Sequence, residues 1–259
     1  MLVWQAAAPS IDCLGPNSYD DVRRVSDQYA ANGNPLFIPE TGGGPSAAAS
    51  VLYAVGKHNA IGFAPFGAEG IYGIPMGLIE SPFEMSGGPG GPGGMPPMMG
   101  GPKPQPITQA YDLLANLQGT IAKAHEAGTI HAFKESGDNG IVIETERFRI
   151  NVVYAGKVSN FITGGGGFPG PKQPGTPDGG GFVIQEDEET FTCVGLGYRL
   201  EFNPKYGDSD PIAYDFVEEG RFVNDQWVPG RRLNGDEVRE GVKLGKTPEA
   251  RRVRVYSYR

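Results

Sequence analysis

The chain has 259 residues, enough for one large domain or two ordinary ones with a sizeable core. Lys and Arg number 22 against 30 Asp and Glu, and this net charge of −8, without a basic stripe, excludes nucleic acid as a partner. The 41 Gly and 23 Pro are concentrated in two tracts, 86–106 and 163–181, and the ordinary composition elsewhere excludes a disordered protein.

The first third of the chain alternates short apolar runs with helical patterns, which is typical of βα units around a parallel sheet. The expected strands are 11–14, 35–38 and 60–64. One expected helix begins at Asp20 and Asp21, whose charges favour a helix N-terminus, and the alanine-rich segment after Pro45 is a second. The Gly/Pro/Met-rich tract 86–106 interrupts this pattern as a loop, because neither a helix nor a strand interior tolerates that composition.

The spacing of apolar residues predicts one long amphipathic helix over 107–127, closed by Gly128. From Ile130 onward the period changes to two, and turn signals separate the runs. The expected strands of this second half are 141–143, 148–152, 182–184, 191–200 and 253–258. We therefore predict two domains, 1–128 of α/β type and 129–259 as an all-β sandwich.

Few features point to a cofactor or a metal. Cys13 and Cys193 lie far apart, without metal-ligand spacing or a disulfide framework, and the three histidines form no HxxH or HExxH motif. The glycine run 164–167 lacks the strand–loop–helix context and the Lys-Ser/Thr of a phosphate-binding loop. We expect no metal and no cofactor. No apolar run approaches the ~20 residues that a membrane helix needs, so no membrane span is expected either.

Polar residues follow the expected strands of the first third. In a parallel sheet or barrel, functional groups gather at the carboxyl ends of the strands. Tyr19, Glu40 and Glu69 come after the first, second and third strands, and Glu40 directly follows an apolar run. The pattern alone leaves both a catalytic and a structural role open for Glu40.

Three segments carry a resemblance to a known family: 3–12 (VWQAAAPSID), 32–40 (NGNPLFIPE) and 60–67 (AIGFAPFG). They resemble the later part of bacterial β-galactosidase-like glycoside hydrolases of the family 35 type, which belong to the clan of retaining (β/α)8-barrel enzymes. The resemblance covers the first 128 residues well and the β half more loosely. It implies the C-terminal part of a (β/α)8 barrel, about strands 6 to 8, followed by a β-rich domain.

The resemblance also implies roles for particular residues. Glu40 matches the nucleophile of a double-displacement mechanism, and Tyr19 matches an aromatic residue beside it. Phe66 and Glu69 match the rim of the sugar site. Asn17 stands where the family pattern Pro-Asp-Ile-Tyr has its aspartate, and the resemblance implies a substrate contact there through an amide in place of a carboxylate. The implied function is a retaining β-glycosidase of β-galactosidase type, with a β-galactoside as its carbohydrate substrate.

A retaining glycosidase also needs an acid/base carboxyl, which in this clan is a glutamate that follows an asparagine. The sequence contains no Asn-Glu dipeptide. We therefore expect a C-terminal fragment that is weakly active or inactive alone, completed by a missing N-terminal barrel half or by an oligomer partner. Family members are often exported, so a periplasmic or secreted full-length protein is expected, although no leader is visible.

Two other functions remain open. The chain could be a non-catalytic carbohydrate-binding or assembly protein that acts through its β half. The aromatic residues that could stack on sugar rings there are Tyr198, Tyr206, Tyr214 and Trp227. A nucleotide-binding α/β protein is disfavoured, because no glycine-rich phosphate loop follows a strand.

Overall fold

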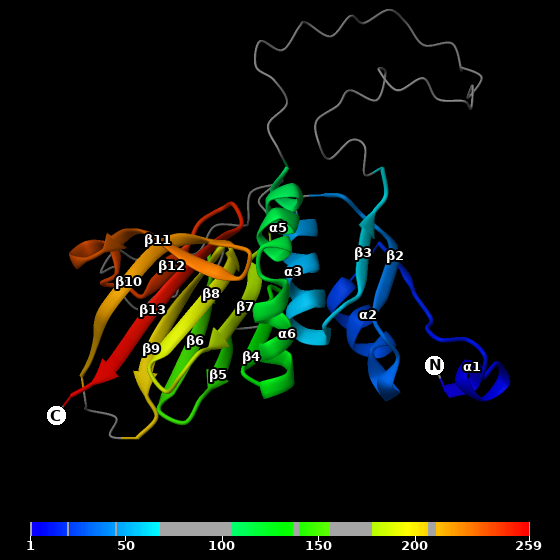
Figure 1. Cartoon of the computed structure of the whole chain (residues 1–259), viewed down its shortest axis with the longest axis horizontal. Helices are drawn as coiled ribbons and strands as arrows, with labels where there is room; N and C mark the ends of the chain where they lie inside the picture. Colours follow the sequence, from blue (N-terminus) through cyan, green and yellow to red (C-terminus); the bar gives the residue numbers. More distant parts are fainter. Residues whose placement is uncertain are drawn as a thin grey trace, which may run out of the picture.

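The computed structural model describes residues 2–19, 21–44, 46–67, 105–136, 140–155, 178–206 and 211–258. Figure 1 shows a small parallel sheet beside the N-terminal helices, further helices in the middle and a larger β part that ends at the C-terminus. Glu69, the glycine run 164–167 and nearly all of the tract 86–106 lie outside the described residues.

Local signals explain where most of the helices begin and end. The helices are α1 (Leu2–Ala7), α2 (Val22–Tyr29), α3 (Ala47–His58), α5 (Pro106–Ala115) and α6 (Gln118–Ala127), with short 3₁₀ turns at Ala31–Gly33 and Gly235–Glu237. The Asp21 carboxylate caps α2 by accepting hydrogen bonds from the backbone N–H groups of Arg23 and Arg24. Gly128 ends α6 in a left-handed conformation, at φ 68°. The predicted single helix over 107–127 is wrong, because the chain breaks between α5 and α6.

The N-terminal strands form a three-stranded parallel sheet in the order β1-β2-β3. They are β1 (Asn17–Ser18), β2 (Phe37–Thr41) and β3 (Gly62–Pro65). The first strand therefore lies later than the predicted 11–14. Gly15 precedes it at a position where a side chain does not fit, because a Cβ there would lie 2.6 Å from the Phe37 carbonyl oxygen.

The strands of the second half form two antiparallel sheets that face each other (Figure 1). The six-stranded sheet has the order β11-β10-β13-β8-β7-β4 and the four-stranded sheet the order β12-β9-β6-β5. Their bounds are β4 (Ile130–Lys134), β5 (Ile141–Glu144), β6 (Phe148–Tyr154), β7 (Gly180–Gln185), β8 (Thr190–Leu196), β9 (Tyr198–Pro204), β10 (Ile212–Val223), β11 (Gln226–Leu233), β12 (Val242–Leu244) and β13 (Glu249–Ser257). The predicted strands 141–143, 148–152 and 182–184 fall within β5, β6 and β7 and are confirmed.

One apolar core lies between the two facing sheets, and it is rich in aromatic rings. Phe133 of β4 meets Tyr198 of β9 edge to face, with ring centroids 4.7 Å apart. Phe148 of β6 contacts Phe191 of β8 in the same way, at 6.1 Å. Such edge-to-face pairs add to the burial of large apolar surfaces and fix how the sheets meet.

The other face of the six-stranded sheet is covered by α3, α5 and α6, which form a second core with it. Alternate residues of β7 and β8 point to this side, among them Phe182 and Val194. Gly56 of α3 lies against Phe182, and a Cβ there would lie 2.7 Å from the ring. Because the helices from before residue 128 bury the outer face of the sheet after it, the core is continuous across the predicted domain boundary.

The predicted fold class, the C-terminal part of a (β/α)8 barrel followed by a β-sandwich, is wrong. The described chain is mostly β-sheet in three open sheets, and none of the three closes into a barrel. In a barrel, the helices form a ring around the parallel strands. Here α3 packs on β4 and β7 of the antiparallel sheet as well as on the helices and β3, so the antiparallel sheet occupies one side of this helical layer.

In the part of the chain that the structure describes, no helix has the length and apolar character needed to cross a membrane.

Candidate functional site

The carboxyl ends of β1 and β2 bring the predicted site residues together. Asn17 of β1 is the register partner of Glu40 of β2, and Tyr19 directly follows β1. Because the strands are parallel and adjacent, their last residues lie at the same edge of the sheet. Residues that are more than twenty positions apart in sequence are thereby placed side by side.

Glu40 accepts hydrogen bonds from both neighbours. The Tyr19 hydroxyl donates to Oε1, and the Asn17 amide nitrogen lies 3.5 Å from Oε2. The pKa of the Tyr19 phenol is raised above its ordinary value, mainly because its hydrogen bond to Glu40 favours the protonated form, with smaller contributions from desolvation and from the Glu40 charge. Tyr19 is 59% exposed and Glu40 is half-buried, so the carboxylate is accessible from solvent and oriented by its neighbours.

Buried polar contacts hold this edge in place. Thr41 donates to the Ser18 carbonyl at 2.6 Å, which fixes β1 against β2 beside Glu40. The Asn34 amide bridges two segments, because it donates to the carbonyls of Leu14 and Tyr29 at 3.0 and 2.9 Å. Its Oδ1 also accepts from the Leu14 N–H at 2.9 Å. The loop before β1 is thus fixed by a side chain from the segment before β2.

Phe66 directly follows β3 and lies at the same edge of the sheet. Its backbone N–H donates to the Thr41 carbonyl at 2.8 Å, and its side chain is 71% exposed. The structure thus brings Asn17, Tyr19 and Glu40 into contact and places Phe66 at the next strand end. Glu69, the remaining predicted site residue, lies outside the described residues.

The four aromatic residues that could stack on sugar rings under the alternative hypothesis do not form one platform. Tyr198 is buried in the core, whereas Tyr206 is 74% exposed. Tyr214 packs against Phe202, with ring centroids 6.2 Å apart. Trp227 lines a separate cavity of about 280 Å³. Its neighbours around that cavity are Thr120, Ile184, Glu186, Thr192, Phe222, Asp225 and Arg252.

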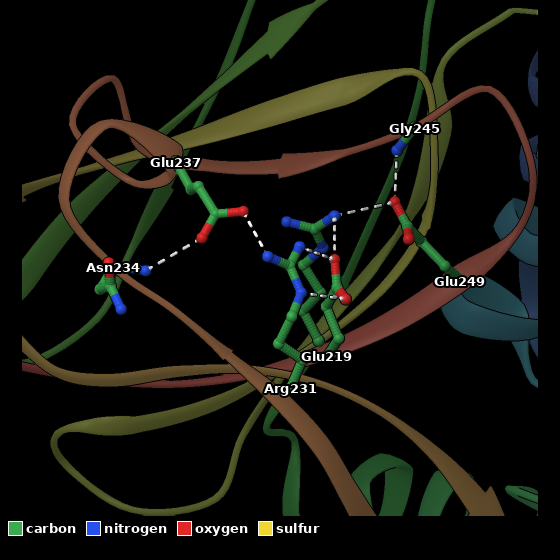
Figure 2. Close-up of polar contacts among 7 residues, drawn as sticks. Glu219, Arg231, Asn234, Glu237, Gly245 and Glu249 are labelled. Atoms are coloured by element: carbon green, nitrogen blue, oxygen red, sulfur yellow. Dashed lines mark hydrogen bonds and ion pairs between the residues drawn. The ribbon is translucent and has the colours of Figure 1, made fainter.

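A larger cavity of about 440 Å³ was not foreseen from the sequence. It lies where β6, β9 and β12 of one sheet meet β13 of the other. Beside it lies a network of charged side chains, shown in Figure 2, in which Arg231 contacts Glu219 and Glu237. In the same network the Glu249 carboxylate accepts a hydrogen bond from the backbone N–H of Gly245.

Metal-binding side chains do not cluster in the described residues, where no group of three or more His, Cys, Asp or Glu is arranged to hold an ion.

Comparison with known proteins identifies the family. Residues 107–245, more than half of the chain, match the family described as a domain of unknown function, DUF5597. The chain belongs to this family. The DUF5597 match begins in α5 and ends just after β12, so it includes the two helices α5 and α6 together with most of the facing sheets. The Glu40 site precedes it. No curated protein matches the chain.

Proposed function

We propose that the protein is a retaining glycoside hydrolase of β-galactosidase type in which Glu40 is the nucleophile. The observation that carries the proposal is the Glu40 carboxylate at the end of a parallel strand, hydrogen-bonded by the Tyr19 phenol. The resemblance of segments 3–12, 32–40 and 60–67 to family 35 enzymes supports it independently of the geometry. DUF5597 itself carries no described activity and neither supports nor opposes this function.

In this mechanism the Glu40 carboxylate attacks the anomeric carbon and forms a glycosyl ester while the bond to the leaving group breaks. Tyr19 and Asn17 hold the carboxylate in one orientation before the attack, and the exposed Phe66 ring offers an apolar surface for the sugar. Water then hydrolyses the ester and releases the sugar. Because Glu40 begins the reaction as a carboxylate, its hydrogen-bond donors must not transfer a proton to it, and the raised pKa of Tyr19 is consistent with that role.

An ordinary glycoside also needs a second carboxyl, ~5–5.5 Å from the nucleophile, to protonate the leaving group. We assign no residue to that role, and the proposal requires another segment or a partner chain to supply it. Loss of this proton transfer typically slows the first step by roughly 10²–10⁴-fold. A substrate with an activated leaving group such as fluoride reacts without it and therefore tests Glu40 directly.

The test is to incubate the protein with 2-deoxy-2-fluoro-β-D-galactosyl fluoride and to follow its mass. We expect the gain of one fluorogalactosyl group, located by peptide mapping on Glu40. Glu40→Gln should abolish labelling, whereas the control Glu144→Gln, an exposed carboxylate in β5, should leave it unchanged. Labelling of another carboxylate, or none at saturating reagent with the protein folded, would refute the proposal.

A second candidate function, carbohydrate binding without catalysis, is favoured by one observation. The Trp227 ring lines the 280 Å³ cavity together with Thr192 and Glu186, so an aromatic surface and hydrogen-bonding groups occur side by side. If this cavity binds sugars, titration with galacto-oligosaccharides should give a signal that Trp227→Ala removes and Glu40→Gln leaves unchanged. Trp4→Ala, at an exposed tryptophan outside the cavity, is the control. Absence of binding to the wild-type chain excludes this candidate.

A further inference from the structure

Tyr19 lies at an exposed strand end, and its contact with Glu40 needs a support beyond the strand itself. The strand β1 has only two residues, which pair with Glu40 and Thr41 of β2. A typical strand has about five or six residues, so the backbone pairing of β1 restrains the residue that follows it only weakly. Tyr19 is also 59% exposed, so the packing of the core does not fix its position.

The Thr41 hydroxyl provides such a support. It donates to the Ser18 carbonyl at 2.6 Å, and both residues are only 2% exposed. This carbonyl belongs to the peptide group that joins Ser18 to Tyr19. Because a peptide group is planar, a hydrogen bond that holds its oxygen also fixes the direction in which the chain continues to the Tyr19 Cα atom. The branched Thr41 side chain has few χ1 rotamers, so the donor is itself restrained.

The Ser18 hydroxyl does not add a second support of this kind. Ser18 is the register partner of Thr41, but its Oγ atom is buried without a hydrogen-bond partner in the described part of the chain. Two buried hydroxyls therefore lie at the same level of neighbouring strands, and only the one on Thr41 is engaged. This difference supplies a matched control, because either hydroxyl can be removed by a small substitution.

The residues around Thr41 also contact Tyr19 and the next strand end. On one side of Thr41, Glu40 accepts from the Tyr19 hydroxyl. On the other side Gly42 lies beside the Tyr19 ring, since a Cβ atom on Gly42 would be 4.0 Å from the ring carbon Cδ1. The Thr41 carbonyl accepts from the Phe66 N–H at 2.8 Å, so this one buried residue connects the ends of all three parallel strands.

We propose that Thr41 is a positioning residue of the Glu40 site, whose hydroxyl acts through the Ser18 carbonyl to hold Tyr19 where its phenol donates to Glu40. Thr41 itself contacts neither the sugar nor the reacting atoms. Its effect on the reaction rests on the proposed function, because the orientation of the carboxylate affects a rate only if Glu40 is the nucleophile. Its effect on the hydrogen bond between Tyr19 and Glu40 does not.

The first measurement is the titration of Tyr19 by nuclear magnetic resonance of labelled tyrosines, with Tyr19→Phe to assign the signal. Thr41→Val exchanges the hydroxyl for a methyl group. It should lower the pKa of Tyr19 from its raised value toward the ordinary one, because the hydrogen bond that chiefly raises this pKa is weakened. Thr41→Ser keeps a hydroxyl and should retain most of the raised pKa, and Ser18→Ala should leave this pKa unchanged.

A purely structural role of Thr41 predicts a different result. Thr41→Val would then lower the free energy of unfolding in urea, while the folded variant would keep the wild-type pKa of Tyr19. Circular dichroism verifies that each variant folds, and Thr41→Ala, which adds no bulk, takes the place of Thr41→Val if the latter does not fold. The proposal is overturned if the folded variant without the hydroxyl titrates like the wild type, or if Ser18→Ala lowers the pKa of Tyr19 as much.

The second measurement is the rate at which 2-deoxy-2-fluoro-β-D-galactosyl fluoride labels Glu40. At saturating reagent Thr41→Val should react about three- to ten-fold more slowly, the usual effect of the loss of one hydrogen bond, and Thr41→Ser should restore most of the rate. The reagent concentration at half of the maximal rate should change little, because the buried Thr41 does not contact the reagent. An unchanged rate in the folded Thr41→Val variant also overturns the proposal. If the wild type is not labelled, the glycosidase proposal fails, and the titration of Tyr19 by itself decides the role of Thr41.

Discussion

A side chain in the hairpin between β10 and β11 caps a helix that lies far away in the sequence. Removal of this cap should lower the stability of the protein by a measurable amount. Asp225, in the turn of this hairpin, accepts a hydrogen bond from the backbone N–H of Thr120 at 2.7 Å. Thr120 is the third residue of α6, and Leu117, at the N-cap position before the helix, provides no side-chain cap. Asp225 therefore supplies the cap from a different part of the chain, and its charge faces the positive end of the helix.

The expected magnitude follows from these two contributions. Loss of a helix cap typically costs about 1 kcal/mol, and loss of a favourable charge at a helix N-terminus about 0.3–1 kcal/mol. Asp225→Gly removes both and should lower the free energy of unfolding by about 1–2 kcal/mol. Glycine is the right replacement because Asp225 has a φ of 63°, where alanine would add backbone strain. Asp225→Asn keeps an acceptor and should lose only the charge contribution.

Urea denaturation followed by circular dichroism at pH 7 and at pH 3 measures these differences. The pKa of Asp225 is lowered from its ordinary value, chiefly because the Thr120 N–H donates to its carboxylate. Because this carboxyl has a lower pKa in the folded state than in the unfolded state, its charge stabilises the protein at pH values above the unfolded-state pKa. This stabilisation is lost as the pH falls through the folded-state pKa. The gap between wild type and Asp225→Asn should therefore narrow at pH 3. Equal stability of wild type and Asp225→Gly at pH 7, or a wider gap at pH 3, would refute the reasoning.

Three further predictions concern single side chains. Glu40→Gln should lower the pKa of the Tyr19 phenol toward its ordinary value, and nuclear magnetic resonance of labelled tyrosines should detect the shift; an unchanged titration would contradict the hydrogen bond. Gly56→Ala should destabilise the protein by about 1–3 kcal/mol in a urea titration, because the new methyl group would lie 2.7 Å from the Phe182 ring; a stabilised variant would show that the ring moves at little cost. The Cys193 thiol should not react with a thiol reagent until the protein unfolds, because it is fully buried and burial raises its pKa; modification of the folded chain at Cys193 would disprove this.

Features with local causes were predictable from the sequence. Asp21 is followed by a helical pattern, and its side chain does cap α2. Gly128 closes α6, as a residue that tolerates positive φ should. Short runs of apolar residues bounded by turn signals placed β5, β6 and β7, and β6 also shows the two-residue period of a strand with one buried face. The proximity of the residues around Glu40 was also predictable, since the carboxyl ends of neighbouring parallel strands lie at the same edge of a sheet. This holds independently of which elements pack on the faces of the sheet.

Features that depend on distant partners were not predictable. Residues 11–14 were predicted to form a strand. In the structure the Asn34 side chain hydrogen-bonds both the N–H and the carbonyl of Leu14, and β1 begins only at Asn17. The pattern over 107–127 predicted one helix. However, the Asp225 backbone N–H donates to the Asn116 carbonyl, and the Asp225 side chain caps the first turn of α6, so the helix is interrupted there. Neither interaction has a signature within the segment that it changes.

The composition and periodicity alone determined that this protein is acidic and folded, with βα units followed by antiparallel strands. They also singled out Glu40. Tertiary structure alone decided what the helices cover: α3 packs on the antiparallel sheet, and among the described residues no barrel closes around the parallel strands. It alone also assembled the larger cavity, whose lining residues Tyr154, Arg199 and Arg251 come from β6, β9 and β13. An apolar helical face specifies that it must be buried, but not against which sheet, because the hydrophobic effect has no direction of its own.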